Sequence, residues 1–297
     1  MGQVSNFLED GLVSVVVPSY NHLRYIRQCI ESIKNQTYRK IQLIVIDDGS
    51  IDGSKDLLLS LSQEYGFELY LQENIGLPAT LNKALANYVR GEFFSICASD
   101  DYFHPEKISK LVSYLNSNKS VPMCFSKTIF VDENDMVQNS VTASANRKFV
   151  GGRIFDKIIT QEFHFLPGMV RTSLYDEFGL YDKDIWTEDF YFNLMVSRKY
   201  EIGFVNEYLN YYRFPTGFSL KLTTLKVPMA HRACIDMYSD SEYYEEAIRE
   251  WNFRNFLWFS GDPCRKKFAF KSMLSSIGCF YRISFIKSFL RLLLKWR

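Results

Sequence analysis

Short apolar runs and amphipathic stretches alternate through the first 131 residues. Five apolar runs predict buried β-strands: Val13–Val17, Ile41–Ile46, Phe67–Leu71, Phe93–Cys97 and Met123–Val131. Between them, apolar side chains recur every third or fourth position, which predicts helices over residues 23–33, 57–65, 78–91 and 105–115. Repeated β-α units of this length predict an α/β fold, with a mainly parallel, Rossmann-type sheet flanked by helices.

Polar residues cluster where three of these strands end. They are Pro18-Ser19-Tyr20-Asn21 after the first strand, Asp47-Asp48 after the second and Ser99-Asp100-Asp101 after the fourth. The carboxyl ends of parallel strands meet at one edge of a sheet, and ligands bind in the crevice beyond them. We therefore expect a binding site at this edge.

The regular alternation fades from about residue 140. The stretch up to Arg213 mixes aromatic residues with isolated polar groups, and the sequence past Lys221 has a helical pattern rich in aromatics. We expect one domain over residues 1–220, followed by a helical, aromatic and basic C-terminal extension over residues 221–297.

Composition and the N-terminal sequence limit which partners and which cellular location we expect. The chain has 297 residues and a formal net charge of +1, so no overall field favours nucleic acid as a partner. Its six cysteines show no C-x-x-C spacing, which argues against a zinc site or a disulfide framework. The N-terminus lacks the basic start and apolar run of a signal peptide, and no run of about 18 uncharged apolar residues occurs. We expect a cytoplasmic protein.

Two acidic pairs at the strand ends are candidates for ligand binding. Asp47 and Asp48 begin a turn, so they accept either from backbone N–H groups or from a nucleotide base or ribose. Asp100 and Asp101 would stand beside them and repel them unless a cation such as Mg²⁺ or Mn²⁺ joins the carboxylates. The alternative for this second pair is that one member caps the helix beginning near Pro105.

A third acidic pair, Glu188-Asp189, lies among bulky aromatic residues. Apolar surroundings raise the pKa of a carboxyl group, which suits a general base. The same residues also suit the capped start of a helix, because a helical run over residues 192–196 follows them.

Six short motifs, each weak singly, occur in one order along the chain. They are Val13-Ser14-Val15-Val16-Val17-Pro18-Ser19-Tyr20-Asn21, Val45-Ile46-Asp47-Asp48-Gly49-Ser50, Asn74-Ile75-Gly76, Ser99-Asp100-Asp101, Glu188-Asp189 and Tyr211-Tyr212-Arg213. This order and spacing closely resemble family 2 glycosyltransferases of the GT-A fold, of the type that builds bacterial O-antigen or capsule polysaccharide. The resemblance covers roughly residues 12–215, with a donor half over 12–131 and an acceptor half over 132–220.

The resemblance implies a role for each matching position. The donor-binding residues would be Pro18, Tyr20, Asn21, Asp47, Asp48, Asn74, Gly76, Asn82, Ser99 and Arg213. Asp100 would be the main protein ligand of a Mn²⁺ or Mg²⁺ ion, with Asp101 as a second candidate. Asp189 would be the catalytic base, and Glu188 would help to orient it or the acceptor.

Two positions depart from the family pattern. Ala98 stands where the first acid of the D-x-D signature is usual, and Phe214-Pro215 follow Arg213 where a histidine is common. We therefore expect a lower metal affinity than is usual. The sequence leaves open whether His164, His231 or a water takes the place of the late histidine, and His164 also has a plain explanation as a loop histidine.

The implied activity is an inverting, metal-dependent hexosyl transfer from a UDP-sugar, with UDP-glucose or UDP-galactose preferred. The implied acceptor is an undecaprenyl-diphosphate-linked sugar. Alternatives are a non-catalytic sugar- or protein-binding member of the fold and a nucleotidyltransferase, although no Gly- and basic-rich signature follows the first strand.

The C-terminal tail is basic and apolar, with no acidic residue after Asp262. An amphipathic helix of this kind can lie on an anionic membrane surface. We expect peripheral attachment at the inner face of a bacterial inner membrane, and the alternative is a terminal helix packed on the catalytic domain.

Overall fold

The computed structural model describes residues 8–166, 168–185, 187–213 and 225–294. The chain divides into two compact units, which are described separately. The first comprises residues 1–154 and 163–224, and the second comprises residues 155–162 and 225–297. The second unit therefore contains the expected C-terminal extension together with a short segment from earlier in the chain.

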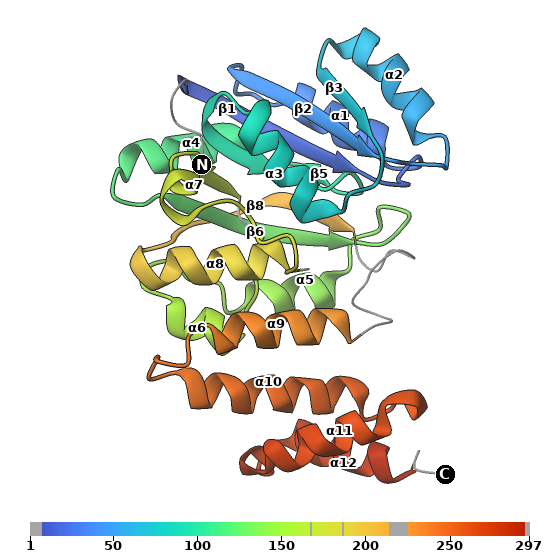
Figure 1. The fold of residues 1–297 in the computed structure, drawn as a ribbon, viewed down its shortest axis with the longest axis vertical. Helices are drawn as coiled ribbons and strands as arrows, with labels where there is room; N and C mark the ends of the chain where they lie inside the picture. The colour runs from blue at the N-terminus through green and yellow to red at the C-terminus, as the bar shows by residue number, and fades with distance from the viewer. Residues whose placement is uncertain (1–7, 167, 186, 214–224, 295–297) are drawn as a thin grey trace. The chain divides into compact units, whose positions relative to one another are not determined.

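An eight-stranded sheet forms the centre of the first unit (Figure 1). The strands are β1 (Glu9–Ser19), β2 (Ile41–Asp48), β3 (Glu68–Gln72), β4 (Gly91–Ile96), β5 (Tyr102–Phe103), β6 (Met123–Val131), β7 (Met169–Arg171) and β8 (Gly203–Arg213). Their order is β3-β2-β1-β4-β7-β6-β8-β5. Four neighbouring pairs are parallel, including β6 with β8, and the pairs made by β7 and β5 are antiparallel. The prediction of a mainly parallel α/β sheet is confirmed.

Helices cover both faces of the sheet. They are α1 (Ile26–Lys34), α2 (Ser54–Tyr65), α3 (Leu77–Asn87), α4 (Lys107–Ser117), α5 (Asn139–Asn146), α7 (Leu174–Phe178) and α8 (Glu188–Lys199). Alternate residues of β1, Val13, Val15 and Val17, pack in one buried cluster with α1, α2 and α4. Because successive strand side chains point to opposite faces, the residues between them face the other side, where α3 packs on β1 and β2.

The strand order fixes where a ligand can bind. Strands β2 and β4 flank β1, and all three run parallel, so the chain winds outward from β1 in opposite directions. The carboxyl ends of β1 and β4 therefore form a topological switch point, the usual position of a ligand crevice. The polar segments after Ser19, Asp48 and Ile96 all leave the sheet at this edge.

The second unit is helical. It contains α6 (Phe155–Ile159), α9 (Lys226–Asp236), α10 (Tyr244–Phe259), η3 (Pro263–Arg265), α11 (Lys266–Ser275), η4 (Ile277–Cys279) and α12 (Ile283–Leu294). Its core is formed by Phe253, Phe256, Phe259, Ala269, Met273, Cys279, Phe285 and Leu292. The described part of the expected extension is thus helical, and α12 packs on α10 and α11. None of the described helices is long and apolar enough to cross a bilayer.

Candidate active site

The turns after β1 and β2 are tied to each other by side-chain hydrogen bonds. The Asn21 backbone N–H donates to Ser50 Oγ, and Asn21 Oδ1 accepts from the Ile51 N–H, each at 2.9 Å. Asn21 has a φ of 56°, in the left-handed region that asparagine tolerates better than most residues. Asp47 accepts from the backbone and the hydroxyl of Ser50 at 3.0 and 2.6 Å. Asn21 and Asp47 therefore shape this edge of the site.

Asp48 organises the loop between β3 and α3. Its Oδ1 accepts from the Ile75 N–H at 2.9 Å and from Gln72 Nε2 at 2.7 Å, and its Oδ2 accepts from the Gly76 N–H at 2.9 Å. Gly76 has a φ of 85°, which favours glycine. The expectation was that Asp48 contacts the donor itself. Its carboxylate holds the backbone of the predicted donor loop, and its contact with the donor stays a prediction.

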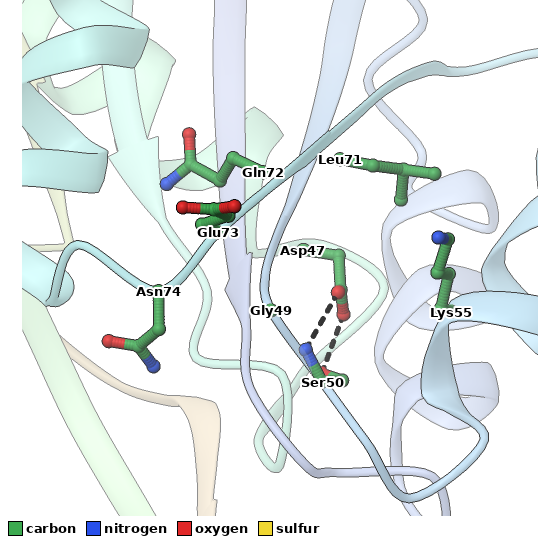
Figure 2. A pocket seen from close by; sticks show the side chains of 8 residues that line it. All are labelled: Asp47, Gly49, Ser50, Lys55, Leu71, Gln72, Glu73 and Asn74. Atoms are coloured by element: carbon green, nitrogen blue, oxygen red, sulfur yellow. Dashed lines mark hydrogen bonds between the residues drawn. The ribbon is translucent and has the colours of Figure 1, made fainter.

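An open pocket of about 450 Å³ lies between these turns, as Figure 2 shows. It is lined by Asp47, Gly49, Ser50, Lys55, Leu71, Gln72, Glu73 and Asn74. Gly49 is required here, because a Cβ at this position would lie 2.8 Å from the Asn74 backbone nitrogen. Of the predicted donor residues, Asp47 and Asn74 line this pocket. Pro18 is half-buried at the end of β1, and Tyr20 beside it is exposed.

Asn82 lies outside this pocket and contacts a different segment. Its Nδ2 donates to the Tyr181 carbonyl at 2.7 Å, and its Oδ1 accepts from the Tyr181 N–H at 2.8 Å. Both halves of the amide are thus bonded to one backbone position. Asn82 therefore braces α3 against the chain that leads to α8, and its predicted role in donor binding stays a prediction.

The two carboxylates that follow β4 have different surroundings. Asp101 is buried, and its Oδ1 accepts from the Arg213 backbone N–H at 2.8 Å. Burial, and then the neighbouring Asp100, raises the pKa of Asp101. Asp100 remains partly exposed. Neither acts as a helix cap, because α4 begins at Lys107 after Glu106. Asp100 is therefore the better placed of the two for a ligand.

A histidine that the sequence did not single out lies beside Asp100. His22 Nδ1 lies 2.8 Å from Ser99 Oγ, and His22 Nε2 lies 3.8 Å from Asp100 Oδ2. Ser99, expected to contact the donor, is buried and serves as the partner of this imidazole. The available signal in the sequence was the position of His22 directly after Asn21, in the first polar segment.

The Arg213 side chain is fully buried and points into the protein. Its guanidinium donates to the carbonyls of Asp100 and Asp132 and to Gln28 Oε1, each at 2.9 Å, and forms an ion pair with Asp135. It also lies over the Tyr25 ring at 4.3 Å from its centroid. The guanidinium is thus bonded to protein groups on several sides, and the predicted contact of Arg213 with the donor stays a prediction.

Glu188 and Asp189 occupy the first turn of α8, after Thr187. The helix dipole favours negative charge at this position. Thr187 makes no side-chain capping bond, and its buried Oγ1 has no partner among the described residues. Asp189 Oδ2 lies 2.8 Å from His164 Nε2, so the loop histidine contacts the predicted base.

Tyr212 shows that the two acidic pairs lie close together. Burial raises the pKa of its phenol, and the negative charges of Asp101, Asp100, Asp189 and Glu188 raise it further. Charge interactions weaken with distance, so these four carboxylates lie in the neighbourhood of Tyr212. The carboxyl end of β4 and the start of α8, far apart in the sequence, therefore both bring acids toward the end of β8.

The donor set after β4 fits a hard divalent cation. Among the residues that the structure describes, no group of three or more His, Cys, Asp or Glu side chains could hold a metal unaided. Mg²⁺ is commonly held by one or two carboxylates together with substrate phosphates. The partly exposed carboxylate of Asp100 is suited to that arrangement, with the phosphates of a donor completing the ligands.

The comparisons with known proteins identify the family and the fold of this chain. Residues 14–179 match the family described as glycosyl transferase family 2, so this chain belongs to that family and is a glycosyltransferase. It is 27% identical over 252 residues to the uncharacterized glycosyltransferase RT0329 of Rickettsia typhi, covering 77% of this chain and 78% of that relative. The sequence-based prediction of the family is confirmed.

Solved structures show that the fold is GT-A. S. aureus TarS 1-349 in complex with UDP-GlcNAc superposes with a TM-score of 0.65 at 16% identity, covering 96% of this chain and 89% of that one. The mannosyltransferase PcManGT from Pyrobaculum calidifontis, in complex with GDP-Man and Mn²⁺, gives a TM-score of 0.54 at 15% identity, covering 95% and 86%. The predicted GT-A-like fold with C-terminal helices is confirmed.

Proposed function

We propose that this glycosyltransferase is a metal-dependent, inverting hexosyltransferase. The observation that carries the proposal is the pair of accessible carboxylates: Asp100 is partly exposed after β4, and Asp189 lies in the first turn of α8 with His164 at 2.8 Å. One carboxylate lies at the switch point of the sheet, where a nucleotide donor is expected, and the other begins α8. The site thus offers a place for a leaving diphosphate and, close to it, a base for the acceptor.

The proposed reaction is a single displacement. Asp189 takes the proton of an acceptor hydroxyl while that oxygen attacks C1 of the donor sugar. The bond from C1 to the diphosphate oxygen breaks, and the nucleoside diphosphate leaves from the opposite face, so the configuration at C1 inverts. A Mn²⁺ or Mg²⁺ ion held by Asp100 and the donor phosphates would neutralise the charge that builds up on the leaving group.

The protein's own contacts support this assignment of roles. His164 fixes the carboxylate of Asp189, Asp48 fixes the donor loop at Gly76, and Asn82 fixes the chain that leads to α8. Preorganised groups of this kind lower the cost of reaching the reactive geometry. Asp101 and Arg213 act in the same way on the segment after β4, so we assign them as positioning residues.

The donor and the acceptor are also proposals. We place UDP-glucose and UDP-galactose first among donors, and an undecaprenyl-diphosphate-linked sugar of an O-antigen or capsule repeat first among acceptors. TarS is solved with UDP-GlcNAc and PcManGT with GDP-Man, so both of these nucleotide sugars belong in the screen.

The test is a screen of the purified protein against these four nucleotide sugars, with Mn²⁺ or Mg²⁺ and the lipid-linked acceptor. We expect release of nucleoside diphosphate with one donor and a product of inverted configuration. No release from any donor would favour the non-catalytic binding alternative. A product of retained configuration would overturn the displacement by Asp189.

We also propose that the second unit attaches to an anionic membrane surface. The α12 outer face consists of Ile283, Ile286, Lys287, Phe289, Leu290, Arg291, Leu293 and Leu294, and all of them are exposed. Exposed apolar residues next to basic ones are typical of helices that lie in the membrane interface. A lipid-linked acceptor would then be presented at the same surface, which is the inner face of a bacterial inner membrane.

The structure shows which residues of α12 are available to contact a membrane. The sequence predicts a basic, amphipathic helix. Phe285 and Leu292 of α12 turn inward to the core, and the α12 outer face carries the other apolar residues. The basic residue Arg282, just before α12, is bound to Glu250 at 2.6 and 2.8 Å. Residues 295–297, the end of the predicted basic helix, lie outside the described residues.

A further inference from the structure

We propose that His22 is a metal ligand together with Asp100, so that the cation site of this enzyme contains one imidazole nitrogen. The inference deepens the proposed function and rests on it, because it concerns the ion that Asp100 would hold. The chain offers a single partly exposed carboxylate after β4, with Ala98 two residues earlier and Asp101 bonded to the Arg213 N–H. A side chain from another element would then supply the second protein ligand of the cation.

The distance between the two candidate ligand atoms fits a shared cation. His22 Nε2 and Asp100 Oδ2 are 3.8 Å apart, which is longer than a hydrogen bond. Two atoms that each lie about 2.1 Å from one cation are separated by about 3 to 4.2 Å, depending on the angle at the ion. The observed separation falls inside this interval.

The other ring nitrogen of His22 has a protein partner. His22 Nδ1 lies 2.8 Å from the buried Ser99 Oγ. With Ser99 as acceptor, the ring proton sits on Nδ1, which leaves the lone pair of Nε2 on the side of Asp100. Histidines that bind metals almost always donate their second N–H to such a partner, which fixes the tautomer and the ring orientation.

Two neighbouring parallel strands bring His22 and Asp100 to the same edge of the sheet. His22 follows β1 and Asp100 follows β4, which are neighbours in the sheet. Both side chains are 16% exposed, so they are shielded yet reachable by a ligand. This position is the switch point of the sheet, where the phosphates of a donor are expected and would supply the remaining oxygen ligands.

A nitrogen ligand has a chemical consequence. Mg²⁺ strongly prefers oxygen ligands, whereas imidazole suits the transition metals. We therefore expect the site to bind Mn²⁺ more tightly than Mg²⁺ in the presence of UDP. His22→Asp, which offers an oxygen ligand in place of the imidazole, should reduce that preference.

The experiment measures Mn²⁺ binding rather than turnover. The full-length protein is titrated with Mn²⁺ in the presence of UDP, and the bound ion is examined by pulsed electron paramagnetic resonance for coupling to a ¹⁴N nucleus. We expect such coupling in the wild type and in the control His104→Gln. His22→Asn should lose the coupling and bind Mn²⁺ at least about tenfold more weakly, and Ser99→Ala should weaken binding by about tenfold as well.

The outcomes separate this inference from the proposed function. If the wild type binds Mn²⁺ without ¹⁴N coupling, and His22→Asn binds it equally well, then His22 only pairs with Asp100 and the inference is overturned while the metal site stands. If neither the wild type nor any variant binds Mn²⁺ or Mg²⁺ with UDP, the metal dependence of the proposed function fails instead. Thermal unfolding of each variant shows that the protein is folded during the measurement.

Discussion

His164 Nε2 lies 2.8 Å from Asp189 Oδ2, so a loop residue before β7 contacts the first turn of α8. The sequence left His164 open as either a replacement for the family's late histidine or an ordinary loop residue. Its contact is with the predicted catalytic base. An orienting hydrogen bond to a base is a recurring arrangement, because it holds the proton acceptor in one rotamer.

The first prediction concerns this contact. His164→Ala should lower kcat by about ten- to a hundredfold with little change in donor KM, because the base is misplaced while the donor pocket is intact. His164→Gln, whose amide N–H can reach Asp189, should recover part of the loss. The check is steady-state kinetics with His104→Gln as the control histidine. A large rise in donor KM with unchanged kcat would instead place His164 in donor binding.

The second prediction tests the base itself. Asp189→Asn should lose at least about two orders of magnitude in transfer while calorimetry still detects donor binding, since a neutral amide keeps the shape but cannot take the proton. Glu188→Gln is the matched neighbour and should be milder. Combining His164→Ala with Asp189→Asn should cost no more than Asp189→Asn alone, because the two residues act as one unit. Wild-type-like turnover of Asp189→Asn would move the base elsewhere, with Glu188 first in line.

The third prediction separates two roles for Arg213. If Arg213 is a buried residue that positions the Asp100 carbonyl, a lysine should not replace it, because lysine lacks the planar fork of donors. Arg213→Lys should lower the melting temperature and weaken Mn²⁺ binding together. If Arg213 contacted the diphosphate instead, the variant would raise donor KM and leave the melting temperature unchanged. Differential scanning fluorimetry combined with a metal titration makes this comparison.

The fourth prediction concerns the α12 outer face. The triple variant Ile286→Ser, Leu290→Ser and Leu293→Ser should abolish sedimentation with anionic liposomes while the protein stays folded and releases nucleoside diphosphate. Leu59→Ser, at an exposed leucine on α2, is the control and should sediment like the wild type. Deleting everything from residue 273 is a poorer test, because Met273 and Phe285 belong to the core of the second unit. Equal sedimentation of the triple variant and the wild type would exclude this face as a membrane contact.

The fifth prediction is a pH dependence of stability. Lys107 is buried with its Nζ 3.2 Å from the centre of the Phe103 ring, and burial lowers the pKa of its amine to about 7. Between pH 7 and the ordinary value of 10.5 the unfolded chain therefore binds more protons at this site, so the free energy of unfolding rises with pH. Relative to Lys107→Met, the wild type should gain stability over this range, by at most about 1.4 kcal/mol per pH unit. Parallel pH profiles of the two proteins would contradict the prediction.

Local patterns in the sequence were enough to predict most of the donor-side fold. The five strands and four helices expected before residue 131 are all present, because buried strands and amphipathic helices leave a periodic signal in a single segment. The positions of Asp48 and Asp100 at the carboxyl edge followed from the same periodicity. The short strands β5 and β7 carry too few residues for such a signal, and β8 was not predicted because its polar and aromatic residues do not alternate cleanly.

The tertiary structure alone determines which partner each polar side chain meets. Asp48, Asn82 and Arg213 lie in motifs typical of donor contacts, yet each is bonded to backbone of a distant segment. His22 and His164 gain their significance only from Asp100 and Asp189, which follow them by 78 and 25 residues in the sequence. A residue type and its neighbours along the chain determine what a side chain can donate or accept. Which atom it meets depends on how β1, β4, β8 and α8 converge, and that is set by packing between segments far apart in the sequence.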